Sequence, residues 1–313
     1  EWRARRGAGM RMAEKLLPAF LEGSRYPDRL PIGTPESIKT SSRERLVRYY
    51  QDWYRPDLMA VIAVGDFDAS SVEKQIAATF SDLKTPDGAR ERKRAEVPAH
   101  AEPRATVIRD DEAEAPIVLI VEKTPHEPTV TYDNMREGLR SLAALLTINR
   151  RLGELAQAPD APFTQAMATI DPNQMIESLD MTQAVAISKN DRANDTLETL
   201  VLELERAKRH GFTGAEVAQT RKQMKAFVNM AINSYPYDDG EQRLSEIVDS
   251  FMRGSTFIGV TAYREMLAEL DDIDASNTAA QFRKEMDKSS RVLTVLGQTK
   301  LSLPSAEQAK STM

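Results

Sequence analysis

The sequence predicts an α+β fold in two parts, each a sheet with helices layered on one face. Strand-like apolar runs precede amphipathic helical segments in each part, which is the order typical of this class. A charged, proline-marked stretch between Lys84 and Pro103 separates the two parts. A chain of 313 residues with 41% hydrophobic composition can bury a sizeable core. We therefore expect domains at residues 1–90 and 104–300, a linker at 91–103 and a disordered, polar tail at 301–313.

The first part is predicted to be mainly helical around one strand. Apolar residues recur every three to four positions over 2–22, and Gly23 can end that helix. The pattern Ser41-Ser-Arg-Glu44 resembles a capping box and predicts a helix through Trp53. The uncharged run Leu58–Val64 predicts a buried central strand, and a further helix is expected from about Ser70 to Phe80.

The second part is predicted to form a sheet and a series of helices. Strand-like runs and helical periodicity alternate along it. The expected strands are 105–109, 117–121, 163–170, 177–188 and 291–296, with the third and fourth antiparallel. The expected helices are 134–155, 195–209, 213–232, 241–252, 262–270 and 275–286.

Charge and composition disfavour several classes of partner. The chain carries 42 basic and 48 acidic residues, for a formal net charge of -6, so it lacks the broad positive field that attracts nucleic acids or acidic membranes. No run of 18 apolar residues occurs, so no membrane insertion is expected. The chain has no cysteine, which excludes disulfides and thiolate chemistry while leaving the compartment open.

Spacing alone reveals no catalytic constellation. His100, His126 and His210 lie too far apart in sequence for any two to share a helical turn, so each is expected to be a surface or loop residue. No Gly-x-Ser-x-Gly elbow or phosphate-binding loop is present. The basic run 90–94 is interleaved with Glu and predicts a solvated linker. The aromatic cluster over 49–54 has helical spacing, which favours a core-facing and interface stripe over a base-stacking platform.

Three longer passages resemble one family. They are Tyr50–Asp68, with its Tyr-Arg-Pro-Asp turn before an apolar run and Gly-Asp; Gly23–Gly33, with its Tyr-Pro loop; and Ala207–Glu216, with Arg-His-Gly-Phe-Thr-Gly-Ala-Glu. Together they resemble the pitrilysin/insulinase-type zinc metallopeptidases, the inverzincins. The resemblance implies two related α/β halves, each with a mostly antiparallel sheet. Residues 1–90 would then be the C-terminal portion of the metal-bearing half, and 104–300 the second homologous half.

The resemblance also implies a zinc site to which this chain contributes one residue. Family members hold zinc through His-x-x-Glu-His and a distal Glu, and the Glu of the motif polarises the attacking water. This sequence has no His-x-x-Glu-His, whereas Glu1-Trp2-Arg3 matches the end of the phrase that carries the distal ligand. Glu1 is thus the candidate metal ligand. Read without the resemblance, it is only a favourable charge at a helix start.

The resemblance favours a fragment of a zinc endopeptidase. The parent would hydrolyse peptides or small unfolded polypeptides by zinc-activated water, with the substrate enclosed between two clamshell halves, in a periplasmic location. The remaining peptidase domains of the parent would be partners of this chain. With no His-x-x-Glu-His of its own, the fragment is expected to be inactive and without resident zinc. The native N-terminus is expected to lie upstream of Glu1. The alternative is a non-catalytic scaffold or interaction module of the same fold, and the upstream sequence would discriminate between the two.

Overall fold

A single five-stranded sheet organises the part of the chain that the computed structural model describes. The described residues are 7–93, 95–171, 176, 178–237, 239–257, 259–286 and 290–313. The strands are β1 (Arg104–Arg109), β2 (Ile117–Pro125), β3 (Phe163–Asp171), β4 (Leu179–Ser188) and β5 (Arg291–Gly297). Their spatial order is β1-β5-β2-β4-β3. Only the β1–β5 pair is parallel, so the prediction of a mostly antiparallel sheet is confirmed for this half.

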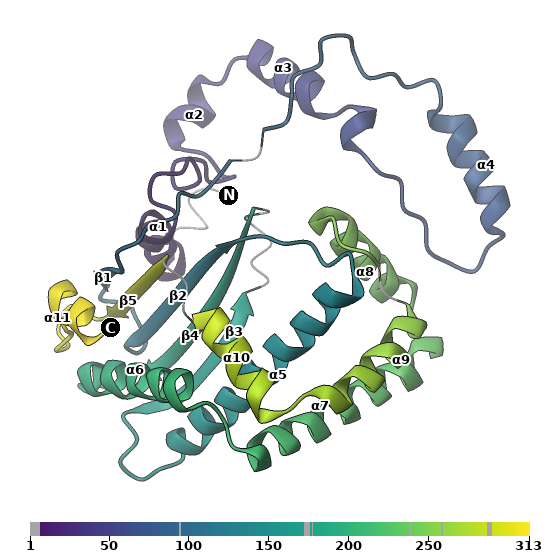
Figure 1. The fold of residues 1–313 in the computed structure, drawn as a ribbon. Coiled ribbons are helices and arrows are strands. Elements are labelled where there is room, and N and C mark those ends of the chain that lie inside the picture. Colours follow the sequence, from purple (N-terminus) through teal and green to yellow (C-terminus); the bar gives the residue numbers. More distant parts are fainter. Residues whose placement is uncertain are drawn as a thin grey trace.

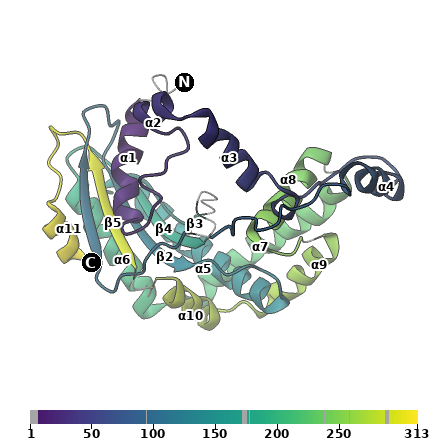
Figure 2. The same ribbon diagram turned by 90° about the horizontal axis from the view of Figure 1, so that it is seen from above.

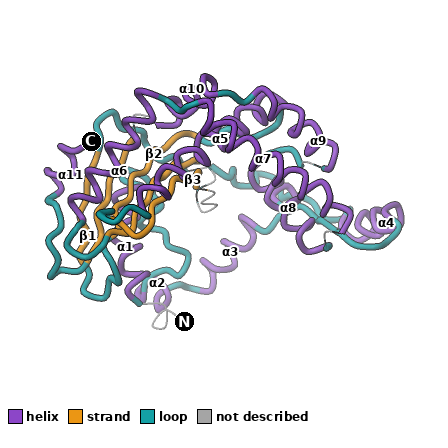
Figure 3. The backbone as a smooth tube through the Cα atoms, turned by 90° about the horizontal axis from the view of Figure 1, so that it is seen from below, coloured by secondary structure: helices purple, strands orange, loops and turns teal. Residues whose placement is uncertain are grey.

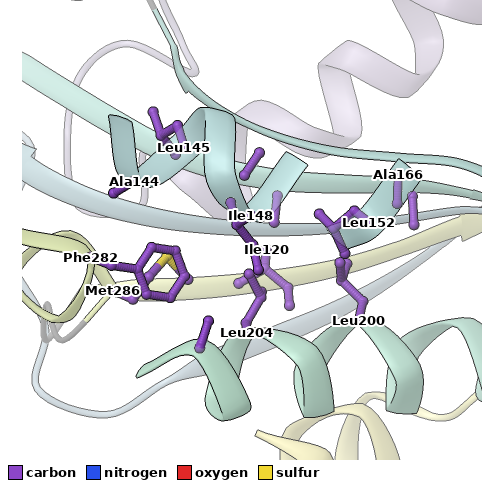
Figure 4. Packing of buried hydrophobic residues seen from close by; sticks show 14 of the residues in the cluster. Ile120, Ala144, Leu145, Ile148, Leu152, Ala166, Leu200, Leu204, Phe282 and Met286 are labelled. Atoms are coloured by element: carbon purple, nitrogen blue, oxygen red, sulfur yellow. The ribbon is translucent and has the colours of Figure 1, made fainter. Parts of the chain in front are cut away.

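The main core lies between the sheet and one layer of helices (Figure 1). This layer comprises α5 (Tyr132–Ala156), α6 (Ala193–His210) and α10 (Ala275–Met286). Ile148 of α5, Leu200 of α6 and Phe282 of α10 are fully buried, and they meet Ile120 of β2 at this interface (Figure 4). Because alternate strand residues face opposite sides, Val118 joins Ile120 on this face.

A second group of helices extends this layer beyond the sheet. It comprises α7 (Gly214–Ser234), the turn η2 (Tyr235–Tyr237), α8 (Gly240–Arg253), α9 (Val260–Glu269) and the turn η3 (Leu270–Asp272). Figure 3 shows α5, α7 and α9 lying beside one another at the far side from β1. The strand pair β3–β4 and all the helices predicted for the second part are confirmed to within about two residues at each end.

The opposite face of the sheet is partly covered by α1 (Ala8–Phe20) and the loop after it (Figure 2). Leu21 is 2% exposed and packs with Val121 of β2 and Met181 of β4. Met12 and Leu16 of α1 pack with a smaller cluster around Ile108. The N-terminal helix is therefore joined to the second half of the chain.

The region after α1 contains the clearest difference from the sequence expectation. It comprises α2 (Pro35–Thr40), α3 (Arg43–Trp53), the turn η1 (Pro56–Leu58) and α4 (Ala69–Phe80). The prediction of a buried strand at Leu58–Val64 is wrong, since residues 59–64 form no strand and Val61 is 51% exposed. A strand needs a neighbouring backbone for its hydrogen bonds, and none of the described residues pairs with this segment. The aromatic stripe over 49–54 was expected to face the core and an interface. The first expectation is wrong for Tyr49, Tyr50 and Tyr54, which are exposed, and the second stays a prediction.

The tail is also ordered, contrary to the expectation for 301–313. Helix α11 (Ala306–Thr312) starts at Ser305, whose hydroxyl accepts the Gln308 N–H in a capping box. Ala309 is fully buried and Leu303 is 8% exposed, and α11 contacts β1, β5 and α6. Composition predicted disorder because few residues of the tail are apolar. In the structure, apolar residues of the tail are buried against other elements.

Segment 84–93 is irregular but packs against α3 and η1. Arg55, 5% exposed, donates to the Arg90 carbonyl oxygen at 2.6 Å, and Thr85 Oγ1 donates to Asp57 at 2.9 Å. These bonds connect the segment just before the predicted linker to the Tyr-Arg-Pro-Asp turn. The division of the chain at 91–103 stays a prediction.

Candidate functional site

The predicted ligand Glu1 lies outside the described residues, but the helix that follows it is firmly anchored. Arg11 of α1 binds Asp110, at the end of β1, through two hydrogen bonds of 3.0 and 3.2 Å. The Arg11 guanidinium lowers the pKa of the Asp110 carboxyl. At the other end of α1, Lys123 Nζ donates to the Phe20 carbonyl at 2.7 Å. Burial lowers the pKa of Lys123 to about 8.

The described residues do not by themselves fit a zinc centre. No group of three or more His, Asp or Glu side chains among them is placed to hold a metal ion. His100 Nδ1 lies 2.7 Å from the Glu102 carbonyl oxygen, and both ring nitrogens of His126 have hydrogen-bond partners. Any zinc bound by a parent protein would therefore need ligands from outside this set. Among the described helices, none has the length and apolarity required to cross a bilayer.

The passage Ala207–Glu216 takes part in contacts that link α5, α6 and α7. We call these contacts the clamp. Arg151 of α5 donates to Glu216 Oε2 at 2.9 Å, lies 3.4 Å from Glu203 of α6, and sits 4.9 Å from the centre of the Phe212 ring. Glu216 also closes the capping box with Thr213 at the start of α7. The Arg151 guanidinium, followed by the Thr213 donors, lowers the pKa of Glu216 to about 2 against the opposing effect of burial. The motif is thus structural in this chain.

Gly211 explains the conformation of the same passage. Its φ of 70° lies in the left-handed region, and a Cβ atom there would come within 2.8 Å of the Ala279 Cβ on α10. Glycine is therefore required where α6 ends and the chain turns into α7.

His126 connects the end of β2 to the end of α8. Its Nδ1 lies 2.9 Å from Asp180 Oδ1 and its Nε2 lies 3.2 Å from the Arg253 carbonyl oxygen. Nearby, Thr256 N–H donates to the Thr129 carbonyl and Thr129 N–H donates to Ser255 Oγ. His126 lies in the loop after β2, within the expectation of a surface or loop residue, and its side chain is only 11% exposed. We call the contacts of His126, Thr129, Ser255 and Thr256 the α8 clasp.

The clasp borders an apolar groove of about 630 Å³ between α5, α7, α9 and the end of α8. Its apolar lining includes Leu139, Leu142, Met224, Phe227, Tyr263 and Met266. Among the described residues that line the groove, none is charged. Thr129, Asn134, Ser255 and Thr256 supply hydroxyl and amide groups. Most pockets that bind organic ligands combine an apolar lining with a few polar groups in this way.

The walls of the groove remain accessible. Leu142 of α5 is 42% exposed and Phe227 of α7 is 61% exposed. Along α8, Leu244, Val248, Phe251 and Met252 are also exposed, which gives this helix an uncovered apolar side. Helical periodicity had predicted these helices, but which apolar faces stay uncovered depends on how the helices pack. Sequence reasoning therefore missed both the groove and the clasp.

Comparison with known proteins agrees with the fold and the passages described above. Residues 40–224, more than half of the chain, match the family model described as the peptidase M16 inactive domain. The chain belongs to this family. The resemblance to insulinase-type metallopeptidases is therefore confirmed, and the M16 inactive domain includes the clamp and most of the sheet.

Similar proteins are longer than this chain. It is 32% identical over 172 residues to a zinc protease PQQL-like protein of Arabidopsis thaliana, covering 55% of the chain and 18% of that protein. It is 24% identical over 260 residues to the probable zinc protease PqqL of Escherichia coli, covering 82% of the chain and 28% of that protein. The chain thus spans less than a third of the length of either relative.

Solved structures share the fold at low sequence identity. The first half of the periplasmic protease PqqL from Escherichia coli superposes with a TM-score of 0.85 at 20% identity, over 99% of this chain and 65% of that one. The ferredoxin protease FusC, solved in complex with Arabidopsis ferredoxin, has a TM-score of 0.78 at 17% identity and is covered over 35% of its length. These likenesses support the M16 clamshell-type architecture.

Proposed function

We propose that this chain is a non-catalytic part of a longer zinc-dependent endopeptidase. The observation that carries the proposal is the match of residues 40–224 to the M16 inactive domain, in a chain whose relatives are named zinc proteases. The chain would support and enclose substrate while the ligands and the general base come mainly from the rest of the parent.

Within that proposal, Glu1 is the one residue of this chain assigned to the zinc. Support comes from the Glu1-Trp2-Arg3 phrase and from the anchoring of α1, which follows it. The Arg11–Asp110 and Lys123–Phe20 contacts hold both ends of α1 against the sheet.

We further propose peptides or small unfolded polypeptides as substrates and a periplasmic location. By analogy of fold, the FusC complex with ferredoxin supports a polypeptide substrate, and the periplasmic PqqL structure supports the location. The remaining peptidase domains of the parent would be the principal partners. The exposed apolar residues Tyr50, Val61 and Phe80 support a contact with those domains in the region 43–83.

The test compares the parent with this chain. The parent should cleave unfolded casein in a zinc-dependent manner, and this chain alone should not, with or without added zinc. In the parent, Glu1→Gln should weaken zinc binding by about tenfold or more, while Glu36→Gln, an exposed change on α2, should leave it unaltered. Full zinc content and an unchanged cleavage rate in Glu1→Gln would contradict the ligand assignment. A parent without zinc-dependent cleavage would favour the scaffold alternative.

A further inference from the structure

Helix α8 lacks the buried side chains that usually fix a helix by packing. None of its residues Gly240–Arg253, all of which the structure describes, is buried. Its first turn lies beside the segment that leads to α4 (Figure 2), because a Cβ atom added at Gly240 would come 3.8 Å from the Val64 carbonyl oxygen. Its C-terminal end meets the rest of the molecule at the α8 clasp. The strength of the clasp therefore decides how firmly this end of α8 is held.

The His126 ring in the clasp has a hydrogen-bond acceptor at each nitrogen. Its Nδ1 lies 2.9 and 3.1 Å from the two carboxylate oxygens of Asp180, and its Nε2 lies 3.2 Å from the Arg253 carbonyl oxygen. An ionised carboxylate and a carbonyl oxygen can only accept, so both bonds require an imidazolium that is protonated on both nitrogens. Arg253 is the last residue of α8, so this cation also lies at the negative end of the helix dipole.

A neutral His126 ring must lose one of the two bonds, and the two acceptors decide which one. Neutral imidazole carries a single N–H proton. Asp180 presents a charged carboxylate with two oxygens to Nδ1, whereas the Arg253 carbonyl is a neutral acceptor for Nε2. Because a hydrogen bond to a charged acceptor is the stronger one, the proton stays on Nδ1. The lone pair of Nε2 then faces the Arg253 carbonyl oxygen, so the bond that is lost is the one to α8.

Charged residues on the elements that meet at the ring act on its protonation in both directions. Asp180 of β4 and Glu127, which follows His126 in the chain, are acidic and favour the charged ring. On α8, Asp249 also favours it, whereas the guanidinium of Arg253 opposes it. Histidine is the residue type whose charge changes between about pH 5 and about pH 8.

We propose that His126 is a pH-sensitive latch for α8. In mildly acidic solution the charged ring holds the C-terminal end of α8 to the ends of β2 and β4. As the pH rises, the ring loses the proton on Nε2 and releases this end of the helix. Because the other end of α8 lies beside Val64, the latch couples the position of α8 and of the adjacent segment to the pH.

The experiment follows amide hydrogen exchange of the 313-residue chain as the pH is raised. Each measured rate is compared with the intrinsic rate at the same pH, which gives a protection factor free of the chemical effect of pH. We expect the protection factors of Ser255 and Thr256 to fall by about tenfold between about pH 5 and about pH 8, the size expected for the loss of one hydrogen bond to a charged group. Long-range proton–nitrogen spectra of the histidine rings should show neutral His126 protonated on Nδ1.

Three substitutions separate the latch from other effects of pH. His126→Gln retains a neutral N–H donor near the position of Nε2 and does not titrate, so protection at the end of α8 should be the same at both ends of the pH range. His126→Phe keeps a ring but removes both nitrogens, so protection should be low throughout. His210→Gln, a matched change at an exposed histidine that ends α6, should keep the pH dependence of the wild type.

Several outcomes would overturn the proposal. Protection factors that do not change with pH in the wild type would show that α8 is held by other contacts. A pH dependence that persists in His126→Gln would place the titrating group elsewhere. A neutral His126 ring protonated on Nε2 would mean that the bond to α8 survives deprotonation. None of these measurements depends on zinc or on cleavage, so failure of the latch and failure of the peptidase proposal are distinguishable.

Discussion

At the scale of single residues, the Arg151–Glu216 pair has the largest predicted effect on stability. Both side chains are 17% exposed, and Glu203 lies beside them. Glu216→Gln keeps a residue that suits the capping box but removes the charge. We expect the free energy of unfolding at neutral pH to fall by about 2 to 3 kcal/mol, a value consistent with the pKa shift of Glu216. Urea denaturation measures it, and Glu198→Gln on the exposed side of α6 is the control.

The same pair predicts a dependence on pH. The pKa of Glu216 is lowered from 4.5 to about 2, so its charge stabilises the fold fully above pH 4.5. That contribution is lost as the pH falls from 4.5 towards 2, because over this range the unfolded protein binds the proton and the folded protein does not. The stability difference between the wild type and Glu216→Gln should accordingly shrink over this range. A difference that stays constant down to pH 2 would show that the ion pair is not its source.

His126 gives a second prediction at this scale. Its two ring nitrogens face a carboxylate and a carbonyl oxygen, so both hydrogen bonds form only when both nitrogens carry protons. Asp180→Ala should loosen the clasp and speed amide hydrogen exchange at Ser255 and Thr256, where the chain leaves α8. Asp180→Asn retains an acceptor and should change exchange much less. Equal exchange in both variants would mean that Asp180 does not hold the clasp.

At the scale of elements, the junction between α6 and α7 depends on backbone geometry. Gly211 has a φ of 70° and lies close to Ala279 of α10. Gly211→Ala should destabilise the protein by about 2 kcal/mol through backbone strain and steric overlap. Gly214→Ala is the matched change, because Gly214 starts α7 in open space, and it should be neutral or slightly stabilising. Thermal unfolding of the two variants checks this, and similar melting temperatures would refute the strain argument.

At the scale of the whole molecule, the chain combines a well-packed body with a loosely packed region. Helices α2, α3 and α4 contain no buried residue, whereas α5, α6 and α10 share the main core (Figure 1). Local stability follows buried apolar contact, so the region 35–83 should open more readily than the sheet. Limited proteolysis should cleave first within 35–83 and leave a resistant body that contains the sheet with α5, α6 and α10. Early cleavage within β2 or α5 would contradict this division.

Local patterns in the sequence were sufficient to predict most of the secondary structure in the second half of the chain. The periodicity of α5 and α7, the alternation in β4 and the capping residue Thr213 each act over a few neighbouring residues. Such signals are present in the chain before it folds, and tertiary packing agrees with them here. The family passages likewise depend on local turn chemistry, as the geometry of Gly211 shows.

Tertiary structure decided the features that depend on contacts between elements distant in the sequence. The run Leu58–Val64 has the composition of a strand, but strand formation requires a second backbone that none of the described residues provides. The tail forms a helix because Leu303 and Ala309 are buried against elements that are distant in the sequence. The groove and the His126 clasp join residues more than a hundred positions apart. Contacts of this kind have no local signature, because they exist only once the helices have packed.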